Sequence, residues 1–195
     1  MYPVTNHSMY TVTNHSLPPH NSVLPETFVD RKAKRVYAIG SLLGTGGFAK
    51  VFLVMDTASG ETLANKIIDK KVFKEKRNAK DKVQREIMIH RQLQHQHIVQ
   101  LVTYIEDSNF VHILLELCPH KTLLHVNKFR KTIDEAEVRY YIKQILVGLE
   151  YIHSRGILHR DLKLGNMFIS SQMTVKIGDF GLASTIEGKL ELIFS

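Results

Sequence analysis

Apolar and polar positions follow two rhythms along this chain, and each rhythm predicts a different kind of secondary structure. Between residues 36 and 117, short runs of β-branched and apolar residues are separated by glycine or polar turns, which is typical of strands. At residues 78–94 and 134–153, apolar residues instead recur at every third or fourth position, as in helices. The patterns predict strands at 36–39, 42–54 around a glycine-rich turn, 61–68, 98–105, 110–115, 167–169 and 175–177, and helices at 78–94 and 134–153.

The predicted helix at 78–94 carries a carboxylate within its apolar stripe. Because a buried, unpaired carboxylate is costly, Glu86 requires a cation there. The candidate is Lys66, which strand alternation places on an otherwise apolar face of the strand at 61–68. Two alternatives stay open, namely a partly exposed Glu86 at the margin of the stripe and a Lys66 that reaches solvent at a sheet edge. The stripe consists of Val83, Glu86, Ile87, His90 and Leu93.

The helix at 134–153 is the longest one that the pattern predicts. Asp134 is expected to cap its first turn, with Glu137 as the capping-box partner, and Gly156 follows its end. Its expected buried stripe is Val138, Ile142, Ile145, Leu149 and Ile152.

The two short strands at 167–169 and 175–177 predict an antiparallel hairpin, because a polar link joins them. The residues that flank the open end of a hairpin become neighbours. Asn166 and Asp179 should therefore converge and present two oxygen ligands suited to a hard cation such as Mg²⁺. Asp161, five residues before Asn166, becomes the candidate base.

The first 35 residues have a different composition from the rest. They are rich in Asn, Ser, Thr, His and Pro, and residues 1–8 are nearly repeated at 9–16. Two copies are too few for a solenoid. The segment is expected to be a disordered tail.

Composition excludes several classes of protein. The chain has 195 residues, of which 44% are hydrophobic and 23% charged, and no apolar run approaches the roughly 20 residues that a transmembrane helix needs. No membrane association is expected. The single cysteine, Cys118, excludes an intramolecular disulfide and fits a reducing compartment, so a cytoplasmic or nuclear location is expected.

The formal net charge of +7 is concentrated in the basic run at residues 70–85. This run has little aromatic interleaving and no RNA-binding or zinc-finger signature. A solvated basic face is therefore expected, and nucleic acid is not an expected partner.

The glycine-rich turn at 44–49 suits phosphate binding. Gly44 and Gly46 lack side chains that would keep backbone N–H groups away from phosphate oxygens. Taken alone the turn also fits an ordinary hairpin whose glycines adopt positive φ, and both interpretations stay open at this point.

Taken together, these features match the protein-kinase signature in order and context: GTGGFAKV at 44–51, Lys66, Glu86, HRDLKLGN at 159–166 and DFG at 179–181. The chain resembles protein kinases from residue 36 to about 184. Lys163 resembles the residue found in serine/threonine kinases. Finer details resemble the polo-like kinase family, namely GGFAK at 46–50, ELC at 116–118, EVRYY at 137–141 and KLGN at 163–166.

The resemblance implies an α+β, protein-kinase-like fold with a complete β-rich N-terminal lobe and only the first part of the helical C-terminal lobe. The expected divisions are a disordered tail at 1–35, the N-terminal lobe and hinge at 36–117, a partial C-terminal lobe with the catalytic loop at 118–184, and a divergent tail at 185–195.

The resemblance also implies ATP and Mg²⁺ as cofactors and assigns roles to residues. Asp161 would orient the substrate hydroxyl and accept its proton, and Lys163 would neutralise charge on the transferred group. Lys66 would contact the phosphates and pair with Glu86, and the metal ligands would be Asn166 and Asp179. The ATP-binding residues would be Leu43, Gly44, Thr45, Gly46, Gly47, Phe48, Ala49, Lys50, Val51, Ala64, Lys66, Leu115, Glu116, Cys118 and Phe168.

The function implied is phosphoryl transfer from Mg-ATP to Ser or Thr of protein substrates. No Ala-Pro-Glu motif or polo-box segment follows residue 181, so a truncated form or fragment is expected, and polo-box docking is not expected from this chain. With part of its packing surface missing, the helix at 134–153 would leave a marginally stable, poorly active chain. The alternative is a weak or inactive nucleotide-binding module that regulates a full-length kinase or its partners. Polo-like resemblance would also allow a centrosomal or spindle location.

Overall fold

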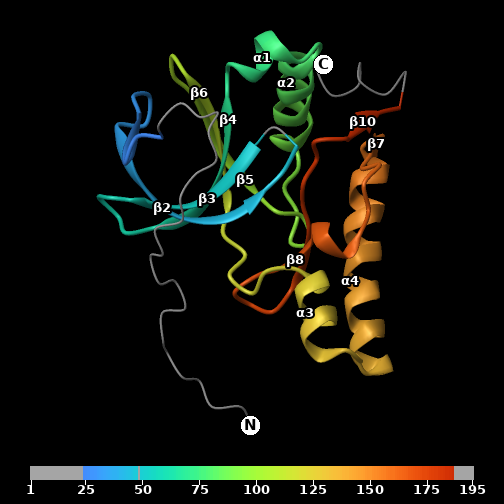
Figure 1. Cartoon of the computed structure of the whole chain (residues 1–195). Helices are drawn as coiled ribbons and strands as arrows, with labels where there is room; N and C mark the ends of the chain where they lie inside the picture. The colour runs from blue at the N-terminus through green and yellow to red at the C-terminus, as the bar shows by residue number, and fades with distance from the viewer. Residues whose placement is uncertain (1–23, 48, 187–195) are drawn as a thin grey trace.

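The computed structural model describes residues 24–47 and 49–186 of the chain, and Figure 1 shows a β-rich part beside a helical part. Within these residues, six antiparallel strands form the main sheet in the order β1-β2-β3-β4-β6-β5. The α+β class predicted from the sequence is confirmed. The strands are β1 Thr27–Asp30, β2 Arg35–Thr45, β3 Ala49–Asp56, β4 Thr62–Asp69, β5 Leu101–Glu106 and β6 Phe110–Glu116.

Strand register gathers side chains from three central strands onto one face of the sheet. In β4, Leu63, Asn65 and Ile67 are buried on the opposite face, so alternation directs their neighbours to this one. Lys66 lies opposite Val51 of β3 and Ile113 of β6 in the register. The predicted strands are confirmed, although β5 starts at Leu101 and not at residue 98.

Strand β1 corrects the expected boundary of the tail. Residues 27–35 are ordered, because β1 pairs with the start of β2 and Phe28 is buried. The Phe28 ring stacks on Tyr37, with centroids 5.1 Å apart, and on His112, at 4.1 Å. The strand was missed because the prediction of a disordered tail rested on the average composition of the first 35 residues, in which a four-residue strand has little weight. Residues 1–23, which carry the repeat, lie outside the described residues.

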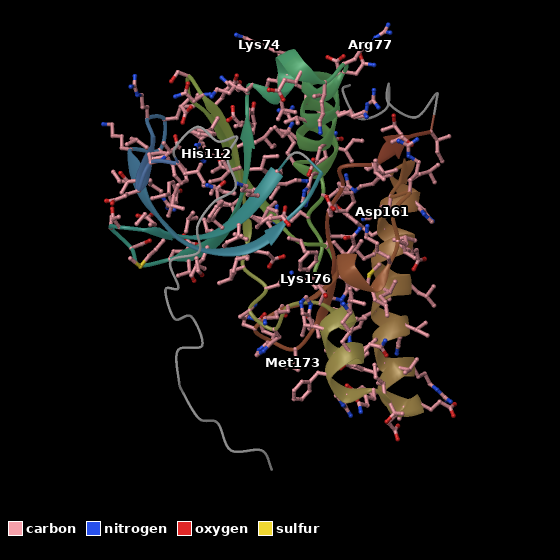
Figure 2. All side chains as sticks on the ribbon, viewed as in Figure 1. Lys74, Arg77, His112, Asp161, Met173 and Lys176 are labelled. Carbon is pink, nitrogen blue, oxygen red and sulfur yellow. The ribbon has the colours of Figure 1, made fainter. Side chains whose placement is uncertain are left out.

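Two helices accompany the sheet, α1 Val72–Glu75 and α2 Ala79–His90. The apolar side of α2 packs against the sheet face defined above, where Val83 and Ile87 join a buried cluster completed by Ala49, Ile68, Leu101, Val111 and Ile113. The predicted stripe is confirmed, but the helix ends at His90, four residues early. The basic run is exposed along these helices, and Lys74 and Arg77 lie far from Asp161 in Figure 2.

The helical part contains α3 Leu123–Arg130, which the sequence pattern did not predict, and α4 Glu135–Ser154. Asp134 caps α4 as expected, since its Oδ1 accepts a hydrogen bond from Ala136 N at 2.8 Å. The prediction that Glu137 completes a capping box is wrong. The Glu137 carboxylate instead accepts from Arg130 Nη1 at 2.7 Å and from the Tyr141 hydroxyl.

The predicted stripe of α4 is confirmed only in part. Ile152 is buried and Ile145 and Leu149 pack against the core, but Ile142 is 49% exposed, and the other buried residues of the helix are Tyr141, Gln144 and Gly148. The difference has a polar cause, because Gln144 Oε1 accepts a hydrogen bond from Val175 N at 2.8 Å. At Gly148, a Cβ would lie only 3.0 Å from His97 O, so the helix backbone approaches this segment closely. A count of apolar residues cannot anticipate a face built on Gln and Gly.

Short elements connect α4 to the end of the described chain: β7 Ile157–Leu158, η1 Leu164–Asn166, β8 Met167–Ile169, β9 Val175–Ile177 and β10 Ser184–Thr185. The predicted hairpin is confirmed as β8 and β9, and β10 pairs with β7. Val175, Ile177 and Phe180 are fully buried in the core of this part.

No helix in residues 24–47 and 49–186 is both long enough and apolar enough to cross a bilayer.

Candidate active site

The ammonium group of Lys66 joins three elements that are distant in sequence. Its Nζ lies 2.6 Å from Glu86 Oε1 on α2 and 3.1 Å from Asp179 Oδ1, two residues after β9. The predicted pair of Lys66 and Glu86 is confirmed, and both alternatives are wrong, because the two side chains are only 17% and 9% exposed. The sheet, α2 and the DFG segment thus meet at one cation.

The charges at this junction stabilise one another. Burial opposes the charge on Lys66, but the carboxylates of Glu86 and Asp179 outweigh it and hold its pKa above the ordinary value. Burial likewise opposes the charge on Asp179, yet the neighbouring Lys66 lowers the pKa of that carboxyl. Both groups therefore remain charged at neutral pH.

Asp161 is held by two donors from its own loop. Its Oδ2 accepts from Lys163 Nζ at 2.7 Å and from Asn166 Nδ2 at 2.9 Å. These bonds, that from Lys163 first, lower the pKa of Asp161. Among the hydrogen bonds of the described residues, Oδ1 accepts none, so it is available to a substrate hydroxyl.

The hairpin brings the predicted metal ligands to neighbouring positions. Gly178 N donates to Asn166 O at 2.9 Å, which places Asn166 beside the residue that precedes Asp179. Both amide hydrogens that Asn166 uses point to Asp161, so its Oδ1 stays free among the described contacts. An amide oxygen and an ionised carboxylate suit Mg²⁺.

The donor set fits a metal that is held only partly by protein. No group of three or more His, Cys, Asp and Glu side chains in the described part of the chain could hold a metal ion alone. Mg²⁺ is commonly bound by one or two protein oxygens, with phosphates and water completing its shell. Asn166 and Asp179 are the residues that would hold it.

Two residues of the site adopt a left-handed backbone conformation, Arg160 at φ 63° and Asp179 at φ 61°. Non-glycine residues rarely adopt this conformation, and it is often found at functional sites. Arg160 is fixed by its Nε, which donates to Leu182 O at 2.7 Å. The surrounding contacts therefore hold the two motifs in a set geometry.

Two histidines pack around Phe180, a feature that the sequence did not reveal. The Phe180 ring lies 4.7 Å from the His90 ring and 4.9 Å from the His159 ring. His90 Nε2 donates to Val99 O at 2.6 Å, and His159 Nε2 donates to Gly178 O at 3.0 Å. These contacts anchor the segment that carries Asp179 to α2 and to the catalytic loop.

We expect the stability of the protein to fall as the pH drops from about 6.5 to 4, because burial lowers the pKa of His90 to about 4. In that window the unfolded chain binds a proton that the folded chain cannot accept. His90 alone contributes roughly 3 kcal/mol to this loss. Urea titrations at several pH values would measure it.

His90→Gln should flatten the dependence only in part, since burial also lowers the pKa values of His112 and His159. Met88→Gln provides the control, because Met88 is exposed on the same helix and carries no titratable group, so this variant should keep the slope of the wild type. An unaltered slope in His90→Gln would contradict the assignment.

An apolar surface lies beside the Lys66 junction. The sheet face that packs on α2 continues past it through Val51, Ala64 and Leu115, which are half-buried and share this face by register. Two further predicted positions are Cys118, which follows β6, and Phe168 in β8, which forms a β-bridge with Thr122. Burial raises the pKa of the Cys118 thiol to about 12, so this group adds apolar surface and no charge. The surface suits a flat apolar ring.

The glycine-rich turn is open around its glycines. A Cβ at Gly44 or Gly47 would meet nothing within 4 Å, and one at Gly46 only Ala49 O at 3.9 Å. The remaining predicted positions are Leu43 and Thr45 in β2, Lys50 in β3 and Glu116 in β6. Ala49 is buried in the cluster under α2, so its side chain does not face a ligand. Phe48 lies outside the described residues.

Comparisons with known proteins agree with this geometry. The protein kinase domain family matches residues 37–193. Serine/threonine-protein kinase PLK1 of Xenopus tropicalis is 47% identical over 164 residues, covering 84% of this chain and 27% of the relative. Polo of Drosophila melanogaster is 45% identical over 164 residues, covering 84% and 28%, and PLK2 of Mus musculus is 45% identical over 159 residues, covering 82% and 23%.

The chain thus spans about a quarter of the length of the curated relatives it matches. The family match covers most of the chain and includes the Lys66 junction, the Asp161 loop and the DFG segment. The protein belongs to the protein kinase family, with the α+β fold of that family and with sequence relatives among the polo-like serine/threonine kinases.

Proposed function

We propose that this chain transfers the terminal phosphoryl group of Mg-ATP to Ser or Thr hydroxyls of protein substrates. The observation that carries the proposal is the placement of Lys66 between Glu86 and Asp179. This arrangement presents a fixed ammonium beside a carboxylate that can hold a cation, which is what a triphosphate with its metal requires.

The mechanism assigns each side chain a task. Asp161 accepts a hydrogen bond from the substrate hydroxyl and takes its proton as the new phosphorus–oxygen bond forms. The bond between the terminal phosphorus of ATP and its bridging oxygen breaks, and ADP leaves, while Lys163 supplies positive charge beside Asp161. Lys66 binds phosphate oxygens, while Glu86 keeps its ammonium in place. Mg²⁺, when bound by Asn166 and Asp179, offsets negative charge on the phosphates. Positioning and electrostatic stabilisation carry most of the catalysis in this scheme.

The proposal includes a division of labour along the chain. Residues 36–117, together with β1, form the lobe that binds nucleotide, and residues 118–184 supply the catalytic loop and the metal ligands. We place the activity in the cytoplasm or nucleus, because the single cysteine of the sequence fits a reducing compartment.

The test is a transfer assay on the full chain with labelled Mg-ATP and casein, followed by phosphoamino-acid analysis. We expect phosphoserine and phosphothreonine but no phosphotyrosine. Mg-ATP should also raise the melting temperature, because a ligand that binds only the native state stabilises it. A stabilising effect of Mg-ATP without any transfer would instead favour a nucleotide-binding regulatory module. The absence of both effects would reject the proposal.

A further inference from the structure

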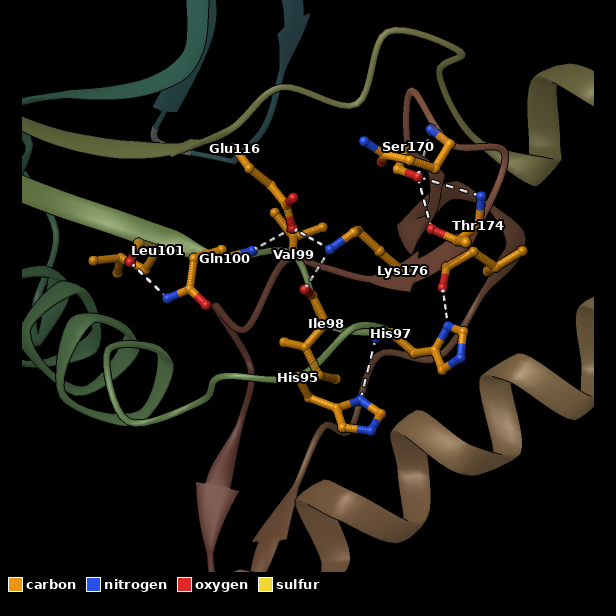
Figure 3. A network of polar contacts seen from close by, with 12 residues as sticks. His95, His97, Ile98, Val99, Gln100, Leu101, Glu116, Ser170, Thr174 and Lys176 are labelled. Carbon is orange, nitrogen blue, oxygen red and sulfur yellow. Dashed lines mark hydrogen bonds and ion pairs between the residues drawn. The ribbon is translucent and has the colours of Figure 1, made fainter.

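Lys176, which has no task in the mechanism above, forms an ion pair with Glu116. Its Nζ lies 2.8 Å from Glu116 Oε1 and 3.5 Å from Ile98 O (Figure 3). The side chains are only 13% and 28% exposed, so water screens the pair less than it screens a surface pair. Lys176 is the central residue of β9, and Glu116 is the last residue of β6.

The same carboxylate oxygen holds a third element. Glu116 Oε1 also accepts from Gln100 N at 2.7 Å, and Glu116 N donates to Gln100 O at 2.9 Å. One residue before, Val99 N donates to Ile177 O at 2.9 Å. The end of β6, residues 98–100 and β9 therefore form a closed ring of polar contacts, which Figure 3 shows around Glu116 and Lys176.

The two ends of the ion pair belong to different halves of the nucleotide site. Glu116 directly follows Leu115, which contributes to the apolar surface. Lys176 lies three residues before Asp179, at the centre of β9. The pair thus spans from the apolar half of the site to the half that would hold the metal ion.

We propose that Glu116 and Lys176 are positioning residues that fix the apolar half of the site relative to Asp179. A nucleotide with its metal must contact both halves at once, and a site held in that geometry beforehand loses less freedom on binding. Neither charged group touches the reacting atoms. The inference rests on the proposed function, because it concerns the same nucleotide site.

The test compares a ligand that spans both halves with one that occupies a single half. In Lys176→Met, we expect the Kd of Mg-ATP to rise about tenfold and that of adenosine to change by less than about twofold. Adenosine needs only the apolar surface, whereas Mg-ATP also needs Asp179. Calorimetric titration of the 195-residue chain measures both constants, and urea titration of each variant measures its stability.

Lys70→Met is the matched control. Lys70 also pairs with a carboxylate, Glu106 at 2.7 Å, and with a backbone carbonyl, Asp107 O, but it lies at the far end of β4 and β5. The Lys70→Met variant should bind Mg-ATP and adenosine with the same Kd values as the wild type. Glu116→Gln removes the charge while keeping an oxygen for Gln100 N, and should reproduce the selective loss even if Lys176→Met folds poorly.

The double variant Lys176→Met/Glu116→Gln should lose no more affinity for Mg-ATP than either single variant, because the two groups act as a unit. Unchanged Mg-ATP binding in both single variants, beside a wild type that binds, would overturn the positioning role alone. An equal loss for adenosine and Mg-ATP would overturn it as well. A wild type that binds neither ligand would overturn the proposed function and this inference together.

Discussion

Asp161→Asn should lower the rate of phosphoryl transfer by about 10²- to 10⁴-fold. The asparagine amide cannot take the proton of the substrate hydroxyl. The substitution also removes the negative charge of Asp161 Oδ2, which accepts hydrogen bonds from Lys163 Nζ at 2.7 Å and from Asn166 Nδ2 at 2.9 Å. Mg-ATP should still bind, because the Lys66 junction is built from other residues. Single-turnover transfer measures the chemical step, and the shift of melting temperature with Mg-ATP reports binding.

Asp81→Asn is the control for this result, since Asp81 is exposed on α2 and the substitution makes the same change in charge. Its transfer rate should match that of the wild type. If Asp161→Asn transferred phosphate at the wild-type rate, the base would have to be another group. If it lost Mg-ATP binding as well, the separation between the catalytic loop and the nucleotide site would be wrong.

Ile152→Ala should lower the free energy of unfolding by about 2 to 5 kcal/mol. Ile152 is fully buried on the inner face of α4, within the core that also contains Ile177 and Phe180. Its truncation removes apolar contacts and leaves a cavity that close-packed neighbours fill only in part. Urea denaturation followed by circular dichroism would measure the change.

Ile142→Ala on the same helix is the matched control, because the apolar pattern placed both isoleucines in one stripe. At 49% exposure, Ile142 has little to lose, and alanine has the higher helix propensity, so the change should stay within about 0.5 kcal/mol. Equal losses of stability at the two positions would mean that Ile142 is buried, as the apolar pattern predicted, and not exposed.

The spacing of apolar residues predicted most of the secondary structure. The strands from β2 to β6, helix α2 and the β8–β9 hairpin follow from spacing alone, whereas β1, β7 and β10 do not. The pair of Lys66 and Glu86 was predicted because each charge sits on an otherwise apolar face, with two alternatives left open, and the structure confirms it. The motifs of the site were readable because phosphoryl transfer restricts residue type at each position.

The misses share a different cause. The buried face of α4 is set by Gln144 and by the close approach at Gly148, which depend on what lies opposite them. β1 is stabilised by pairing with β2 and by the Phe28 stack on His112, and neither leaves a mark on its own short sequence. The pair of Glu116 and Lys176 joins residues that no periodic pattern connects. These features depend on tertiary contacts between distant residues, and the local pattern of one sequence does not reveal which residues will meet.

The contact between Lys66 and Asp179 also has a bearing on how the protein is made. The two residues are 113 positions apart, whereas Lys66 and Glu86 are only 20 apart. Short loops close at lower entropic cost, and chains emerge from the ribosome N-terminal end first. Lys66 and Glu86 can therefore pair while the later residues are still being synthesised. Asp179 follows β9, so the junction gains its second carboxylate late in synthesis. Under the proposed function, we expect the ability to bind Mg-ATP to appear late in the folding of the chain.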